Sequence, residues 1–143
     1  MDILFVASVA LITTDKGTRE LLLGTLGLPL APHEPGDEYV FSDKIEGSKH
    51  FGAWPLAQAA QSCFGTPEWP SSKPVPQVSV EFEVKDEAAV ASAEKELRAA
   101  GHEVLHATRK EPWGQTVCRV LTREGAIVGI SYAPWMHGGV TGA

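Results

Sequence analysis

Several ionisable side chains stand where they could do chemistry on a small molecule. Glu81 and Glu83 alternate with apolar residues, so both carboxylates project from one face of an extended strand. Arg119 lies in an apolar run, either as the buried partner of Glu81, Glu83 or Glu111 or as a ligand contact. His50, on another extended segment, is either a hydrogen-bonded structural residue or a general base.

Large aromatic rings form the second candidate group. Trp54, Trp113 and Trp135 are predicted at strand ends or in loops, and Trp69 lies in a proline-rich segment. Rings at the mouth of a cavity suit stacking on a planar ligand. The alternative for each ring is a plug in the core or in a dimer interface. The other rings of these regions are Tyr39, Phe41, Phe51 and Phe64.

Strand alternation assigns these side chains to faces. If a helix covers the valine and phenylalanine face of residues 77–84, the opposite face looks into a cavity. His50, Gly52 and Trp54 likewise share one side of their strand. Small residues at the floor leave room for a ligand. The residues predicted to face the cavity on the other strands are Ser8, Ala10, Ile12, Ser79, Glu81, Glu83, Ile127, Gly129 and Ser131.

A sequence repeat positions these residues. Ser8 and Asp15 recur 71 positions later as Ser79 and Asp86, and a valine follows each serine. Each copy is typical of a strand that runs to an aspartate capping a helix. A repeat with a period of about half the chain indicates two copies of one supersecondary unit.

The remaining elements follow from local patterns. Residues 3–13 predict the first strand, and shorter strands are expected at 38–41 and 49–54. Four prolines within residues 65–76 exclude a central strand or helix and mark a linker. The second half repeats the order, with a helix between Asp86 and Gly101. Its strands are predicted at residues 77–84, 102–107, 116–121 and 126–132.

Composition narrows the function classes. The chain of 143 residues carries a net charge of −6, which weighs against a nucleic-acid partner. Its apolar runs are shorter than the roughly 20 residues of a membrane span. Cys63 and Cys118 form no C-x-x-C pair and predict reduced, buried thiols. We expect a cytoplasmic protein without membrane contact, with His33, His102 and His137 on its surface.

The order strand, helix, three strands, twice over, resembles the vicinal oxygen chelate superfamily, which includes glyoxalase I, extradiol dioxygenases and bleomycin-resistance proteins. The most specific local match is Glu-Pro-Trp-Gly-Gln at residues 111–115, which is similar to a segment of bleomycin-resistance-type members. The turn at residues 122–126 partly matches their Asp-Pro-x-Gly-Asn turn.

The resemblance implies an α+β fold in which two tandem βαβββ modules curl their sheets into one cup. It also implies a homodimer, in which strands can be exchanged between subunits. The modules would comprise residues 1–64 and 77–136, with a linker at 65–76 and a tail at 137–143.

Related enzymes place a metal-binding His, Gln or Glu seven residues before each capping aspartate, and a Glu four residues after the final turn glycine. The residues here are Ser8, Ser79 and Gly129. The fourth metal position of the family would lie within residues 50–54, where the sequence leaves the register open. A divalent ion needs three or four imidazole, carboxylate or thiolate ligands, and His50 alone cannot hold one. A two-residue shift in register is the alternative and would bring in Glu81. We expect no metal and no other cofactor.

These features favour capture over catalysis. By resemblance, the chain is a metal-independent binding protein that sequesters an antibiotic or other natural product with aromatic or cationic parts. The alternatives are a glyoxalase- or dioxygenase-like enzyme, with Glu81 or His50 as general base if it lacks a metal, and a metabolite-sensing module. The predicted ligand-binding residues are Trp54, Trp113, His50, Phe41, Ser79, Glu81, Gly129, Ser131, Arg119 and Trp135.

Overall fold

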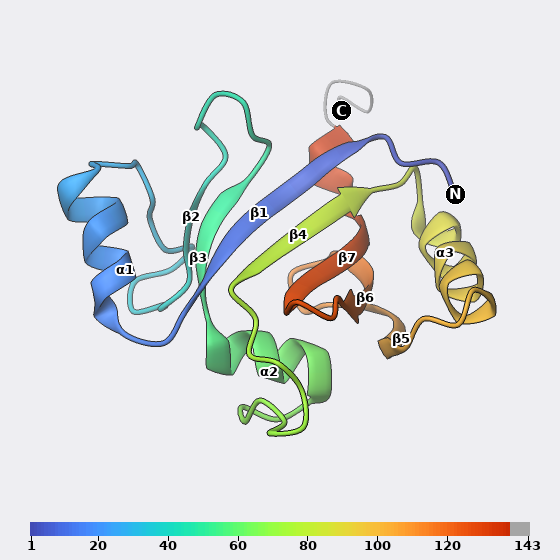
Figure 1. The fold of residues 1–143 in the computed structure, drawn as a ribbon. Coiled ribbons are helices and arrows are strands. Elements are labelled where there is room, and N and C mark those ends of the chain that lie inside the picture. The colour runs from blue at the N-terminus through green and yellow to red at the C-terminus, as the bar shows by residue number, and fades with distance from the viewer. Residues whose placement is uncertain (138–143) are drawn as a thin grey trace.

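Seven strands form one mixed sheet in the computed structural model, which describes residues 1–137 (Figure 1). The strands are β1 (Phe5–Thr13), β2 (Val40–Ser42), β3 (Phe51–Pro55), β4 (Val78–Glu83), β5 (Val104–Lys110), β6 (Thr116–Leu121) and β7 (Ala126–Tyr132). The helices are α1 (Lys16–Glu20), which continues as the π-helix η1 (Leu21–Thr25), α2 (Leu56–Phe64), α3 (Glu87–Ala99) and the 3-10 helix η2 (Pro134–His137). The predicted α+β class is confirmed, whereas most of the predicted tail at 137–143 lies outside the described residues.

The strand order is β2-β3-β1-β4-β7-β6-β5. From the central pair β1 and β4, the neighbours on the two sides correspond: β3 to β7, and β2 to β6. β1 is parallel to β3, which is antiparallel to β2; β4 is parallel to β7, which is antiparallel to β6. The central pair β1 and β4 is antiparallel, and Val9 lies opposite Val80. Ser8 therefore faces Glu81 across this pair, and Ser79 faces Ala10. The 71-residue repeat thus appears in the sheet as a near two-fold arrangement.

The first half departs from the predicted three strands after its helix. Only β2 and β3 form there, and an isolated bridge between Ala31 and Phe41 stands where β5 pairs with β6 in the second half. Pro32 and Pro35 follow this bridge. Because proline has no backbone N–H to donate to a strand ladder, the segment stays a loop.

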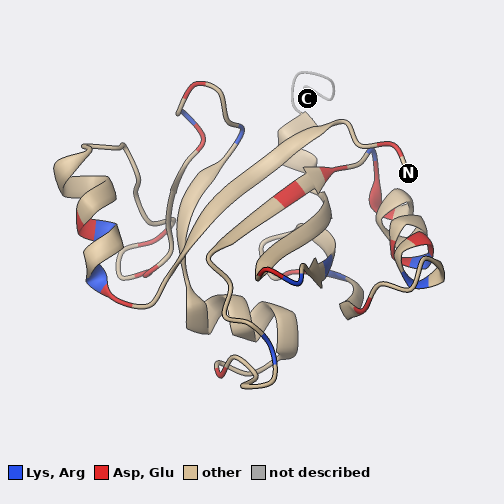
Figure 2. Cartoon of the chain, in the orientation of Figure 1, with Lys and Arg blue, Asp and Glu red and all other residues tan. Residues whose placement is uncertain are grey.

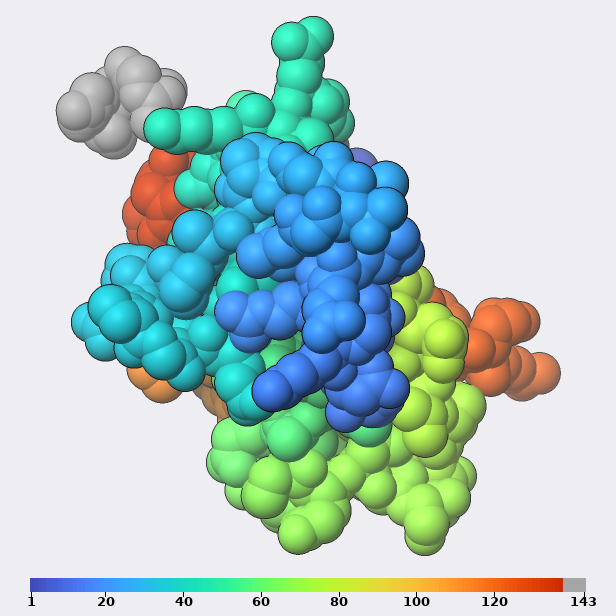
Figure 3. Space-filling model, turned by 90° about the vertical axis from the view of Figure 1, so that its left-hand side faces the viewer, coloured from blue at the N-terminus to red at the C-terminus, as the bar shows by residue number. Residues whose placement is uncertain are grey.

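Both predicted helix caps are present. The side chain of Asp15 accepts from the Gly17 N–H at 2.8 Å, and that of Asp86 accepts from the Ala89 N–H at 2.8 Å. The two helices differ in packing. Helix α1 buries no residue, whereas α3 buries Val90 and Ala93 against the second half of the sheet. Figure 3 shows the first-half face, where the α1–η1 region packs beside the loop that leads to β2.

Helix α2 was not predicted, although its alanine-rich sequence favours a helix. It begins after Pro55 and ends at Gly65, whose φ of 79° is left-handed. Ala59 and Cys63 on its inner face pack against Ile127 of β7. The proline-rich segment 65–76 follows without helix or strand, as predicted. Helix α2 thereby fills the space beneath the centre of the sheet (Figure 1).

Charge is distributed unevenly over these elements. Acidic and basic residues both occur on α1 and α3 and in the loops, while most of the sheet is uncharged and β4 carries acidic residues (Figure 2). Among residues 1–137, no helix is long and apolar enough to cross a membrane.

Candidate functional site

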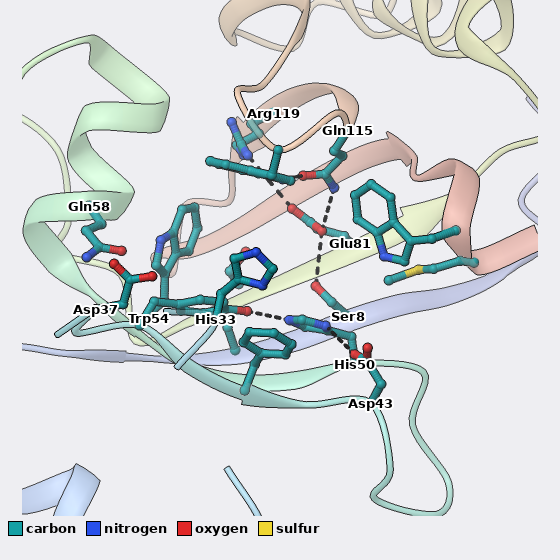
Figure 4. A pocket seen from close by; sticks show the side chains of 17 residues that line it. Ser8, His33, Asp37, Asp43, His50, Trp54, Gln58, Glu81, Gln115 and Arg119 are labelled. Carbon is teal, nitrogen blue, oxygen red and sulfur yellow. Dashed lines mark hydrogen bonds and ion pairs between the residues drawn. The ribbon is translucent and has the colours of Figure 1, made fainter. Parts of the chain in front are cut away.

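A pocket of about 610 Å³ lies over the junction of β1 and β4 and extends to β3, β6, α2 and η2 (Figure 4). Its volume is in the range of small-molecule sites. Its lining comprises Ser8, Ala10, His33, Asp37, Tyr39, Phe41, Asp43, His50, Trp54, Gln58, Ser79, Glu81, Trp113, Gln115, Arg119, Trp135 and Met136.

Strand alternation accounts for the floor of the pocket. Ser8 and Ala10 of β1 and Ser79 and Glu81 of β4 face it, whereas Phe82 packs on the opposite side with the α3 core. The same parity places His50, which directly precedes β3, and Trp54 of β3 in the lining, while Phe51 and Ala53 pack with the first-half core. The face assignment made from the sequence therefore holds for these residues.

The structure brings together eight of the ten predicted ligand-binding residues. Gly129 and Ser131 lie outside the lining. Ser131 is fully buried and accepts a hydrogen bond from Gln115 Nε2 at 2.8 Å. A Cβ on Gly129 would lie 3.1 Å from Cγ of Glu81, so this glycine leaves room for that side chain. Both residues support the pocket from beneath.

Three other residues predicted to face the cavity also lie outside its lining: Ile12, Ile127 and Glu83. Ile127 is buried against α2. Glu83 is fully buried, and its Oε2 accepts from the Ala133 N–H and from His137 Nε2. Burial raises the pKa of Glu83. His137, predicted on the surface, is instead a partly buried partner of this carboxylate.

We call Glu81, Gln115 and Arg119 the polar wall. Gln115 Nε2 donates to Glu81 Oε1 at 2.9 Å, and Ser8 Oγ donates to the same oxygen at 3.1 Å. Trp113 Nε1 donates to Gln115 Oε1 at 2.9 Å, which fixes the orientation of the Gln115 amide. The carboxylate of Glu81 is therefore held from two sides, with its other oxygen left free of hydrogen bonds among residues 1–137.

Two residues outside the pocket lining, Glu111 and His106, fix the position of the Arg119 guanidinium. Its Nη1 donates to Glu111 Oε1 at 3.0 Å and to His106 Nε2 at 3.1 Å. Arg109 Nε donates to the same Glu111 oxygen at 3.1 Å. Burial lowers the pKa of His106. Its Nδ1 lies 2.9 Å from the carbonyl oxygen of Ala107, which leaves Nε2 to accept from Arg119. Of the two alternatives for Arg119, the structure shows the buried partner of Glu111, and it also places Arg119 in the lining of the pocket, where a ligand contact stays a prediction.

Tyr39, Phe41 and His50 form the opposite, aromatic wall. The Phe41 and His50 rings stack at 4.8 Å, and those of Tyr39 and Phe41 at 5.5 Å. Tyr39 Oη lies 2.5 Å from His50 Nε2, and His50 Nδ1 lies 2.8 Å from Asp43 Oδ1. Burial, followed by the charge of Glu81, raises the pKa of the Tyr39 hydroxyl. Asp43, His50 and Tyr39 therefore form a hydrogen-bonded chain that begins at an exposed carboxylate.

Gly52 makes the aromatic wall possible. A Cβ there would lie 2.7 Å from Tyr39 Oη, closer than real contacts allow. Gly52 pairs with Ala10 as Gly129 pairs with Glu81, and Ala10 and Glu81 are 71 positions apart. The fourth expected metal position, left open by the sequence, is therefore a second glycine.

The residues at the four expected metal positions do not fit a divalent ion. They supply two hydroxyls, from Ser8 and Ser79, and two glycine hydrogens. Glu81 does line the pocket, as the alternative register, shifted by two residues, would require for a metal ligand. Even so, no three His, Cys, Asp or Glu side chains of residues 1–137 form a group that could hold a metal.

Sequence reasoning missed several lining residues. His33, Asp37 and Asp43 come from loops, whose course no periodicity reveals. Gln58 comes from the unpredicted α2, and Gln115 was quoted only as part of a motif. A signal did exist for Gln58, because the residues from Leu56 to Cys63 carry helical spacing of small and apolar side chains.

The sequence matches no protein-family model and no curated protein. Similar solved structures include a glyoxalase/bleomycin resistance protein/dioxygenase superfamily member from Vibrio splendidus, 16% identical over 90% of this chain and 97% of that one, with a TM-score of 0.56. Methylmalonyl-CoA epimerase from Streptomyces coelicolor is 14% identical over 93% of this chain and 96% of its own, with a TM-score of 0.55.

A third similar structure is named NAD-dependent benzaldehyde dehydrogenase, from Legionella pneumophila. It is 10% identical over 87% of this chain and 96% of its own, with a TM-score of 0.57. At these identities the likeness concerns the fold and not the activity. The chain therefore has the fold of structures in the glyoxalase/bleomycin resistance/dioxygenase superfamily.

Proposed function

We propose that this protein belongs to the vicinal oxygen chelate superfamily and captures a small planar organic molecule without a metal. The observation that carries the proposal is the combination found in one pocket. Serine and glycine stand at the expected metal-ligand positions Ser8, Ser79, Gly52 and Gly129, yet a volume of about 610 Å³ remains open between the aromatic wall and the polar wall.

The lining supports a ligand with aromatic and cationic parts. Trp113 and Trp135 are each about half exposed at the mouth, where a planar molecule could stack on them. Asp37, Asp43 and Glu81 outnumber Arg119, the one Lys or Arg in the lining. An excess of carboxylates beside aromatic rings favours a cation. A natural-product antibiotic of this chemistry, sequestered by a homodimer in the cytoplasm, is the specific form of the proposal.

Titration of the intact protein with planar antibiotics, in the presence of EDTA, tests this function. Tryptophan fluorescence and calorimetry should show saturable binding, with the ligand recovered unchanged. Trp113→Ala should weaken binding about tenfold, equal to about 1.4 kcal/mol. Trp69→Phe is the matched control, because Trp69 lies outside the pocket and packs edge-on against Phe64. Failure of every aromatic compound to bind would contradict the proposal.

A metal-free enzyme is the second candidate, and the chain Asp43–His50–Tyr39 favours it. A carboxylate that orients a histidine, which in turn contacts a hydroxyl, is an arrangement suited to proton transfer. The fold likeness to an epimerase is compatible with this candidate. Analysis of recovered ligand by mass spectrometry and chiral chromatography distinguishes the two, since capture leaves it unaltered. Under the enzyme hypothesis, His50→Gln abolishes turnover while binding persists.

A further inference from the structure

Arg119 presents unused hydrogen-bond donors inside the pocket wall. The residue is 1% exposed, and its Nε and Nη2 have no hydrogen-bond partner among residues 1–137. Nη1 is fully engaged with Glu111 and His106. A buried charged donor without a partner is costly, so its presence in a lining residue points to a ligand acceptor.

Glu81 presents an acceptor beside these donors. Its Oε1 already accepts from Ser8 and Gln115. Its Oε2 lies 3.9 Å from Arg119 Nη2, too far for a hydrogen bond between them. Figure 4 shows Arg119, Gln115, Glu81 and Ser8 along one side of the pocket. The polar wall therefore places the unpartnered donors of Arg119 beside the free acceptor Oε2 of Glu81.

We propose that the ligand binds this pair through an amide-like edge, namely a carbonyl oxygen adjacent to an N–H, as in a lactam or carboxamide. The carbonyl would accept from Arg119, and the N–H would donate to Glu81 Oε2. The inference rests on the proposed capture function and names the ligand group that the polar wall would recognise.

The local charges favour a neutral edge over an ion. Arg119 is balanced by Glu111, whose Oε1 is 3.0 Å away, and by Glu81. A carboxylate placed here would meet the charge of Glu81, and an ammonium group would meet that of Arg119. An amide edge satisfies both partners without adding charge to a buried site. Cationic parts of the ligand would then lie toward Asp37 and Asp43.

The pair is also held in place before any ligand arrives. Ser8 and Gln115 fix one oxygen of Glu81, and Gly129 leaves space for its side chain. Glu111 and His106 fix Arg119. Such preorganisation reduces the entropic cost of binding.

Four planar probes of similar size test the inference by tryptophan fluorescence and calorimetry: 2-quinolone, 1-methyl-2-quinolone, quinoline-2-carboxylate and protonated 4-aminoquinoline. 2-Quinolone should bind the wild-type protein at least tenfold more tightly than its N-methyl derivative, which lacks the N–H. It should also bind more tightly than either ion. This comparison needs no variant of the protein.

The variant Glu81→Gln sharpens the test. Because Ser8 and Gln115 both donate toward Oε1, the new amide keeps its oxygen there and places its NH2 where Oε2 lay. A donor would then face the N–H of the lactam, and the tenfold preference should disappear. Glu103→Gln removes the same charge from an exposed residue outside the pocket and should preserve the preference.

The outcomes separate the two proposals. If the aromatic probes bind but 2-quinolone and its N-methyl derivative bind equally, or if an ion binds best, the amide-edge inference is wrong while capture stands. If none of the four binds, both fail. A preference for 2-quinolone that Glu81→Gln leaves intact would also overturn the inference, because the N–H would then be recognised elsewhere.

Discussion

The two halves of the pocket share a frame but carry different chemistry. In each half a glycine on the strand parallel to the central strand leaves room for a polar side chain, Gly52 for Tyr39 and Gly129 for Glu81. The first half then builds an aromatic wall near solvent, and the second half a buried, charged polar wall. A duplicated backbone can thus place stacking surface on one side of a ligand and hydrogen bonds on the other.

The difference extends to what stands behind each wall. The polar wall is held by Glu111, which is 4% exposed and accepts from both Arg119 and Arg109. The aromatic wall is held by Asp43, which is 53% exposed and contacts His50. Removing one partner of a buried ion pair in the second half should destabilise the protein strongly, because the other charge is left buried and uncompensated. Removing a partner of the exposed contact in the first half should cost little, because water solvates the remaining group.

Removing the Glu111 carboxylate, which pairs with Arg119 behind the polar wall, should lower the free energy of unfolding more than any other change. Glu111→Ala leaves Arg119 without its main counter-charge in a buried site, which should lower the free energy of unfolding by about 3–5 kcal/mol. Urea denaturation measures it. The control Glu103→Ala removes the exposed partner of Lys73 and should cost no more than about 1 kcal/mol. Equal losses in the two variants would refute the asserted difference in burial.

Alanine substitution should destabilise the protein more at Gly52 than at Gly129. Gly52→Ala drives a Cβ into the Tyr39 ring at 2.7–3.0 Å and should destabilise the protein by about 1–3 kcal/mol. Gly129→Ala meets the flexible Glu81 side chain at 3.1 Å and should cost less. Thermal unfolding of both variants tests the order. A greater cost at Gly129 would show that the polar wall, not the aromatic wall, has the tighter backbone contact.

The helix caps provide a smaller comparison. Asp86→Ala removes the cap of the 13-residue α3, which packs on the second core, and should cost about 1 kcal/mol. Asp15→Ala removes the cap of α1, which has five residues and buries none of them, so its loss should affect global stability less. Hydrogen exchange of the α1 and α3 amides would resolve the two effects, and matching losses would count against the packing difference.

The smallest predicted effect is a pH dependence in the second half. The backbone N–H of Thr108, and then Arg98, lower the pKa of Glu94 to about 2. The folded pKa is below the unfolded one, so Glu94 contributes stability above about pH 4.5 that is lost as pH falls toward 2. Because Glu94 is near solvent, Glu94→Gln should cost at most about 1 kcal/mol at neutral pH. That difference should vanish near pH 2; a constant difference would rule out titration of Glu94 as its cause.

The sequence was most informative where one local rule decided the structure. The alternation around Ser79 and Glu81 predicted both the strand and its pocket face, because a period of two leaves one solution for a half-buried strand. The repeat predicted two copies of one supersecondary unit, and the aspartate of each copy caps a helix as expected.

Local sequence patterns did not reveal the features of the site that depend on contacts between distant segments. The position of Gly52 beneath Tyr39 depends on strand register, which residues 38–54 do not reveal alone. The contact between His50 and Asp43 crosses a loop, and Glu83 was misplaced because its strand parity matches Glu81 while η2 covers it through His137. Helix α2 was overlooked beside a linker rich in proline, although its own sequence is helical.

Capture of a ligand without a metal is the central claim. The direct measurement is calorimetric titration of the protein with a planar ligand in EDTA and again after addition of Ni²⁺, Zn²⁺, Fe²⁺ or Mn²⁺, with chemical analysis of the recovered ligand. We predict the same affinity under all conditions, a saturating stoichiometry and an unaltered ligand. Affinity that appears only with a metal, or a ligand returned as a different compound, would contradict the account.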